Sequence, residues 1–76
     1  MSTDSTARAV TVRALPIELS QFVKFAGLAE SGGQAKQLIG EGAVQLNGVV
    51  VTQKGRKLAA GDRVSLNGQT VIVQLA

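Results

Sequence analysis

The sequence predicts a small α+β domain in which two short helices precede a run of β-strands. Apolar residues recur at helical spacing in two successive segments of the first half of the chain. In the second half, two Asn-Gly dipeptides lie between short runs of apolar residues, which is the strongest short-range signal for a β-hairpin. The length of 76 residues allows one domain. An apolar fraction of 45% with a charged fraction of 17% indicates a folded rather than a disordered chain.

The polar segment 1–8 precedes the first expected element. Its beginning is rich in Ser and Thr and has no apolar period, so we expect a flexible N-terminal tail and a single domain over residues 9–76. From Ala9 to Ala14 apolar and polar residues alternate, which indicates a short strand at a sheet edge. Pro16 ends this strand, because proline fixes its own φ and disfavours helix in the residue before it.

The first helix is expected to run from about Ile17 to Gly27. Its buried stripe has the spacing i, i+3, i+4, i+7 and consists of Leu19, Phe22, Val23 and Ala26. Glu18 in the first turn and Lys24 near the end would both complement the helix dipole. Gly27 is a natural C-terminal stop, because glycine accepts the left-handed conformation that often follows a helix.

The second helix is expected to begin at Ser31. Ser31 and Gln34, three residues apart, fit a capping box. The stripe that should face the core consists of Ala35, Leu38 and Ile39. Gly40 and Gly42 end the helix, and Gly42 is the better candidate for a left-handed cap. The opposite face consists of Gly33, Lys36, Gln37 and Gly40, so it should be flat and accessible.

The remainder of the chain predicts two hairpins. Segments 43–46 and 49–52 flank Asn47-Gly48, and segments 64–66 and 70–75 flank Asn67-Gly68. A type I′ turn needs positive φ at both central residues, which Asn and Gly tolerate. Between the hairpins, Gly61-Asp62 indicates a further turn.

The composition argues against an enzyme. Because Cys and His are both absent, the chain has no thiolate nucleophile, no disulfide, no transition-metal site and no histidine general base. The carboxylates do not converge, since Glu30 and Glu41 lie at opposite ends of one short helix. We therefore expect no catalytic residue, no cofactor, no bound metal and no small-molecule substrate.

The sequence also contains no apolar run long enough to span a bilayer. We expect a cytoplasmic protein that does not bind membranes, in agreement with the absence of disulfides in so small a domain. A monomer is the expected oligomeric state.

The strongest functional signal is electrostatic. Lys54, Arg56 and Lys57 place three cations in four residues with no nearby acid, and the net charge is +3. Lys36 adds a cation on the exposed face of the second helix, beside the glycines of an open helix start. Such a surface could clamp a phosphate backbone. A solvated loop without a partner and a loop that contacts an acidic protein remain open alternatives.

The aromatic residues refine the expected target. Phe22 and Phe25 are the only aromatics, and both lie on the first helix. Phe22 belongs to the core stripe, whereas Phe25 is off its centre and either covers an edge or stacks on a base. Because the strands offer no aromatic platform for splayed bases, RNA would be held by its backbone, shape and 2′-hydroxyls.

The run Ser31-Gly-Gly-Gln-Ala-Lys-Gln-Leu-Ile-Gly-Glu-Gly-Ala-Val-Gln-Leu-Asn-Gly48, followed by Leu58-Ala-Ala-Gly-Asp-Arg-Val64, resembles the S-four-type RNA-binding domain, or alpha-L motif. This module occurs in a small-subunit ribosomal protein, bacterial tyrosyl-tRNA synthetases and many pseudouridine synthases. The resemblance covers roughly residues 19–66 and is greatest to the free-standing YbcJ-like branch. It implies two short helices packed on a small, mostly antiparallel β-sheet.

The resemblance also implies a non-catalytic module that binds structured RNA, such as ribosomal or transfer RNA. By motif position, the RNA-facing residues are Ser31, Gln34, Lys36 and Gln37 on the second helix, with Lys54, Arg56 and Lys57 on the adjacent loop. For Ser31 and Gln34 the capping role stands beside the RNA-facing one. Many family members carry Arg directly after the motif Ser, where this chain has Gly32, which should weaken RNA affinity or change the target. The rival hypothesis is a protein-interaction adaptor whose basic loop contacts an acidic partner.

Overall fold

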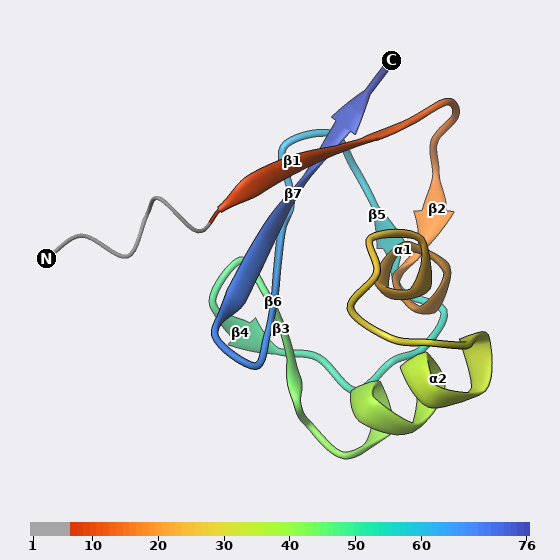
Figure 1. The fold of residues 1–76 in the computed structure, drawn as a ribbon, viewed down its shortest axis with the longest axis vertical. Coiled ribbons are helices and arrows are strands. Elements are labelled where there is room, and N and C mark those ends of the chain that lie inside the picture. Colours follow the sequence, from red (N-terminus) through yellow and green to blue (C-terminus); the bar gives the residue numbers. More distant parts are fainter. Residues whose placement is uncertain (1–6) are drawn as a thin grey trace, which may run out of the picture.

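The first and last strands lie side by side in one sheet, and two helices lie together on one side of it (Figure 1). The computed structural model describes residues 7–76, so residues 1–6 of the tail expected over residues 1–8 lie outside the described part, and Arg8 belongs to β1. In chain order the elements are β1 (Arg8–Val12), β2 (Ile17–Glu18), α1 (Leu19–Phe25), α2 (Gly32–Gly40), β3 (Val44–Leu46), β4 (Val49–Val50), β5 (Lys57–Leu58), β6 (Arg63–Leu66) and β7 (Gln69–Leu75).

Over residues 7–76 the main sheet has five strands, in the order β1-β7-β6-β3-β4. β1 pairs with β7 in parallel, with Val10 opposite Val73, and the other pairs are antiparallel. β2 and β5 form a separate two-stranded antiparallel sheet. These pairings confirm the expected α+β fold with a mostly antiparallel sheet, and they confirm that β1 is an edge strand.

Both predicted hairpin turns are present. Asn47 and Gly48 have φ of 53° and 85°, and Asn67 and Gly68 have φ of 53° and 77°. Positive φ at both central residues is what a type I′ turn requires. The dipeptides therefore set the register of β3 against β4 and of β6 against β7.

The core lies between the helices and one face of the main sheet. Alternate strand residues such as Val64, Val71 and Val73 are buried, as the two-residue period of a strand requires. From α1, Leu19, Phe22 and Val23 are fully buried. From α2, Ala35 and Ile39 are fully buried. In the described part of the chain, seventeen apolar residues form this one cluster, which confirms the helical stripes with one exception.

That exception is Leu38, which was expected in the core stripe but is only partly buried at its margin. Ile39 next to it has no exposed surface. The face of α2 that packs on α1 therefore centres on Ala35 and Ile39, and Leu38 lies to one side of it.

The first helix starts later than expected. Ile17 and Glu18 form β2 and pair with Leu58 and Lys57, so helix begins only at Leu19. Glu18 is thus the extended N-cap residue and not part of the first turn. Its backbone N–H donates to Oε1 of Gln21 at 3.1 Å. The prediction of helix from Ile17 was wrong because a partner strand far along the chain takes up these residues.

Smaller differences concern the ends of elements. β1 ends at Val12 and not at Ala14, because the chain bends over residues 13–15. β4 ends at Val50, before Val51 and Thr52. Both helices end as predicted, since Gly27 and Gly42, each with φ of 81°, lie just beyond their last turns.

Candidate nucleic-acid interface

The start of α2 is held by two of the residues that the motif assigns to RNA. Oγ of Ser31 accepts a hydrogen bond from the backbone N–H of Gln34 at 3.1 Å. In return, the Gln34 side-chain carbonyl accepts from the backbone N–H of Glu30. The capping role predicted for Ser31 is therefore present, and the reciprocal bond of Gln34 reaches one residue before the N-cap. Both side chains are exposed and keep unused donors, the Ser31 hydroxyl and the Gln34 amide.

The outer face of α2 presents one charged side chain. Lys36 and Gln37 are exposed, between Gly33 and Gly40. Nε2 of Gln37 donates to Oε2 of Glu41 at 3.2 Å, one helical turn later. Lys36 forms no ion pair with any residue in the 7–76 range. Its ammonium group can therefore meet an anionic partner without first leaving a protein carboxylate.

The basic loop, defined here as residues 53–57, is fastened to the start of α1. The backbone N–H of Leu19 donates to the carbonyl of Arg56 at 2.8 Å, and that of Ser20 donates to the carbonyl of Lys54 at 3.2 Å. These bonds satisfy two N–H groups that the first turn of a helix leaves without partners. α1 in turn packs on α2 through the core. The backbone of the basic loop is thus held in place against α1, which packs on the helix that carries Lys36.

One cation of the basic loop is already paired, which corrects the expectation of a cluster with no nearby acid. Nζ of Lys57 lies 3.4 Å from Oε2 of Glu18, and the two side chains are 60% and 43% exposed. The pair follows from the β2–β5 register, which places Glu18 opposite Lys57. Lys54 and Arg56 are exposed and have no ion pair within residues 7–76.

Sequence reasoning missed Glu18 as part of this site. The two partners of the ion pair are 39 residues apart, and no local pattern links them.

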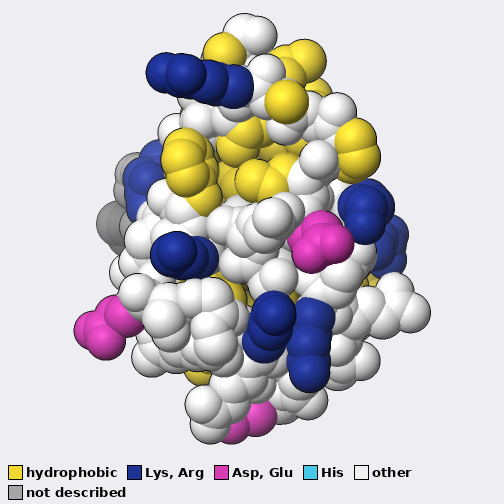
Figure 2. All heavy atoms as spheres, turned by 90° about the vertical axis from the view of Figure 1, so that its right-hand side faces the viewer, with side chains coloured by type: hydrophobic (Ala, Val, Ile, Leu, Met, Phe, Trp, Pro, Cys, Tyr) yellow, Lys and Arg dark blue, Asp and Glu magenta, His cyan; other side chains and the backbone are white. Residues whose placement is uncertain are grey.

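A second cation also has a structural role, because the Arg8 guanidinium donates to the carbonyl of Ala26 at 2.7 Å, where α1 ends. Figure 2 shows the helical side of the molecule, with separate groups of Lys and Arg side chains and acidic side chains among them.

Neither a metal-binding cluster nor a membrane-spanning helix is found in the described part of the chain. Within 7–76, no group of three or more Asp or Glu side chains could hold a metal ion. In the same range, no helix has the length and hydrophobicity needed to cross a membrane.

Comparison with known proteins shows that this chain is similar to several proteins of one family. The family model described as "S4 domain" matches residues 10–74. The Escherichia coli protein named "Putative RNA-binding protein YbcJ" is 46% identical over 57 residues, which are 75% of this chain and 81% of that protein. The solution structure of YbcJ, described as revealing an alfaL motif involved in RNA-binding, has a TM-score of 0.67 at 40% identity. The structural match covers 87% of this chain and 85% of the YbcJ chain. The Bacillus subtilis "Probable ribosome maturation protein RlbA" is 37% identical over 62 residues, 82% of this chain and 87% of that protein.

Proposed function

This chain belongs to the S4 domain family, and from that premise we propose that it is a non-catalytic RNA-binding module. The observation that supports the proposal most directly is the fastening of the basic loop to α1, which itself packs on α2. Because of these hydrogen bonds, the backbone at Lys54 and Arg56 does not have to be ordered when RNA binds. Ordering a loop on binding costs free energy, so a loop held in advance favours affinity.

In the proposed interface, the cations and the polar residues have different tasks. Lys36, Lys54 and Arg56 contact phosphates, and Lys57 contributes less because Glu18 neutralises part of its charge. Ser31, Gln34 and Gln37 keep donors that can reach phosphate or 2′-hydroxyl oxygens. None of these seven residues is aromatic, so they offer no platform on which splayed bases could stack, which favours recognition of RNA shape.

The proposed partner is structured RNA, with ribosomal RNA favoured by the name of the RlbA relative. The module acts as a monomer in the cytoplasm in this proposal, and it needs neither a cofactor nor a small-molecule substrate. Residues 9–76 then form one binding domain.

Nuclease treatment of the purified protein tests the proposal. We expect nucleic acid to co-purify with the protein, and we expect ribonuclease to remove both this nucleic acid and the association of the protein with ribosomal fractions. In a titration at fixed salt, a hairpin RNA should bind more tightly than an unstructured strand of equal length. A protein partner that stays bound after ribonuclease, with no affinity for the hairpin, would establish the adaptor hypothesis instead.

A further inference from the structure

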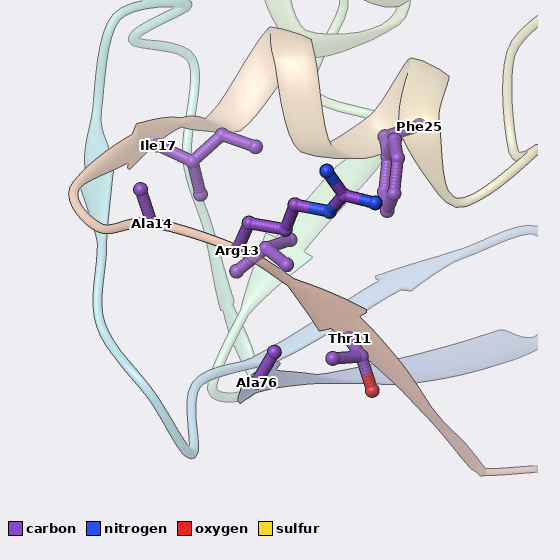
Figure 3. Close-up of a pocket in the computed structure, with 7 residues that line it drawn as sticks. Thr11, Arg13, Ala14, Ile17, Phe25 and Ala76 are labelled. Carbon is purple, nitrogen blue, oxygen red and sulfur yellow. The ribbon is translucent and has the colours of Figure 1, made fainter.

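An open groove of about 430 Å³ runs beside α1, between that helix and the end of β1. Its walls are mainly apolar and include Ala14, Ile17 and the ring of Phe25. Figure 3 shows the Arg13 side chain extending across the groove toward the Phe25 ring. The site proposed above contains neither of these two residues.

Most of the Phe25 side chain lies outside the core. Its side chain is 61% exposed, whereas Phe22, one turn earlier on the same helix, is fully buried. A ring with that exposure covers little of the core. The sequence leaves two roles open for Phe25, to cover an edge of the core or to stack on a base, and this exposure favours stacking. Exposure of a large apolar ring is unfavourable in water, and a stacked partner would remove that cost.

The charge of the groove indicates what kind of partner fits. Among the lining residues in the described part of the chain, Arg13 has the only charged side chain. Lys24, the neighbour of Phe25 in sequence, is also exposed. A guanidinium group is planar and offers several N–H donors in a fixed fork, which suits a phosphate or the edge of a base. An aromatic face beside such a cation complements a nucleotide, which combines a flat ring with a negative charge.

The groove also lies close to the basic loop. The first residue of α1, Leu19, is hydrogen-bonded to that loop, and the last residue is Phe25. At a rise of about 1.5 Å per residue, these helix ends are separated by roughly 9 Å. One RNA molecule can therefore reach both places.

We propose that this groove binds one unpaired nucleobase, which stacks on Phe25 while Arg13 donates to the adjoining phosphate. The inference rests on the proposed RNA-binding function and adds to it the recognition of a single base beside the structured element. The preferred RNA is then a hairpin or a stem with an unpaired nucleotide, and not a continuous duplex.

The test uses hairpin RNAs that carry the fluorescent base aminopurine at successive loop positions. With the wild-type protein, we expect stacking to quench aminopurine at one position. Phe25→Leu keeps an apolar side chain but removes the aromatic face, so it should abolish this quenching and weaken binding about 5- to 150-fold. Phe25→Tyr should behave as wild type. Val50→Ala is the matched control, because Val50 is 52% exposed on β4 and does not line the groove.

The salt dependence of affinity separates this inference from the proposed function. If Phe25→Leu quenches aminopurine and binds the hairpins as wild type does, with the salt dependence intact, the groove does not bind a base and only this inference fails. If the wild-type protein shows no salt-dependent affinity for any hairpin, the proposed function fails and the inference with it. Self-association of the wild type that Phe25→Leu abolishes, with hairpin binding unchanged, would assign the groove to a second copy of the chain.

Discussion

Asn47 and Asp62 join the two β-hairpins through their side chains. Nδ2 of Asn47 donates to Oδ1 of Asp62, 15 residues later, at 3.2 Å. Oδ1 of Asn47 accepts from the backbone N–H of Arg63 at 3.0 Å, and Oδ2 of Asp62 accepts from that of Ala59 at 2.8 Å. The Asn-Gly and Gly-Asp-x-Val segments that carry the family resemblance thus meet in one network. At these positions the motif residues hold the two hairpins together.

We predict that loss of this network lowers stability without changing RNA affinity. Asn47→Gly removes the side chain, while glycine tolerates the positive φ of the turn. Asn67→Gly is the matched control, because Asn67 has the same φ of 53° and no side-chain hydrogen bond within residues 7–76. In urea unfolding, Asn47→Gly should be less stable than Asn67→Gly by about 1 kcal/mol. Equal unfolding midpoints would show that the network contributes nothing measurable.

The two unpaired cations of the basic loop should carry the salt dependence of RNA binding. Lys54→Ala and Arg56→Ala each remove one cation that meets a phosphate, so each should reduce the slope of log affinity against log salt by roughly 0.7–0.9. Arg63→Ala removes an exposed cation from β6, outside both α2 and the basic loop, and should leave the slope unchanged. Titrations over a range of salt concentrations measure all three slopes. A slope that Arg63→Ala reduces as much as Lys54→Ala does would indicate diffuse charge attraction and not a defined interaction of the loop with RNA.

Removing the Glu18 carboxylate should strengthen RNA binding. Glu18→Gln leaves Lys57 without its acidic partner, so a third cation becomes available to phosphate and the salt slope becomes steeper. Stability should change little, because exposed ion pairs contribute about 0–1 kcal/mol and glutamine retains a hydrogen-bond acceptor. The measurement is an RNA titration alongside a thermal melt. Weaker binding by this variant would mean that Lys57 does not face the RNA.

Two substitutions on α2 should separate folding from binding. Ile39→Ala removes a fully buried side chain and should lower the free energy of unfolding by roughly 2–5 kcal/mol. In so small a domain, this loss is enough to unfold a large fraction of the molecules. Lys36→Glu changes an exposed residue and should alter stability by no more than about 0.5 kcal/mol. It should nevertheless impair RNA binding, because a negative charge takes the place of a cation that meets phosphate. A Lys36→Glu variant that binds RNA normally would remove α2 from the interface.

Restoring the family arginine next to the motif serine should increase affinity. A Cβ built at Gly32 meets no atom within 4 Å, so α2 has room for a side chain at this position. Gly32→Arg should therefore fold normally and steepen the salt slope by roughly 0.7–0.9. Gly32→Ala is the control, since it changes helix propensity without adding charge. The same RNA titration distinguishes them, and identical affinities for both variants would place residue 32 outside the interface.

The predictions from sequence succeeded where the determinant was local. The two Asn-Gly turns, the Ser31 cap and the glycines after both helices depend on a few adjacent residues, and each is present. The helical stripes were also correct apart from Leu38, because a period of 3.6 defines a face but not its exact margin.

What sequence could not predict depends on distant partners. Nothing in Ile17-Glu18 indicates that it pairs with Lys57-Leu58, although this pairing determines where α1 begins. The same pairing brings Glu18 to Lys57 and so reduces the available charge of the basic loop. Similarly, Phe25 lines a groove together with residues 11–14 at the end of β1, and its own segment does not reveal this juxtaposition.

The position of β7 between β1 and β6 has a consequence for the order of events during synthesis. Within residues 7–76, β1 is the first strand to be synthesised, yet its only neighbour in the sheet is β7, the last strand. A nascent chain that stops before residue 69 therefore has β1 without its partner and a core that lacks Val71 and Val73. Pairing between residues so far apart in sequence also slows folding. The main sheet can be completed only after β7 has been synthesised. The domain therefore cannot finish folding until nearly all of its residues have been made.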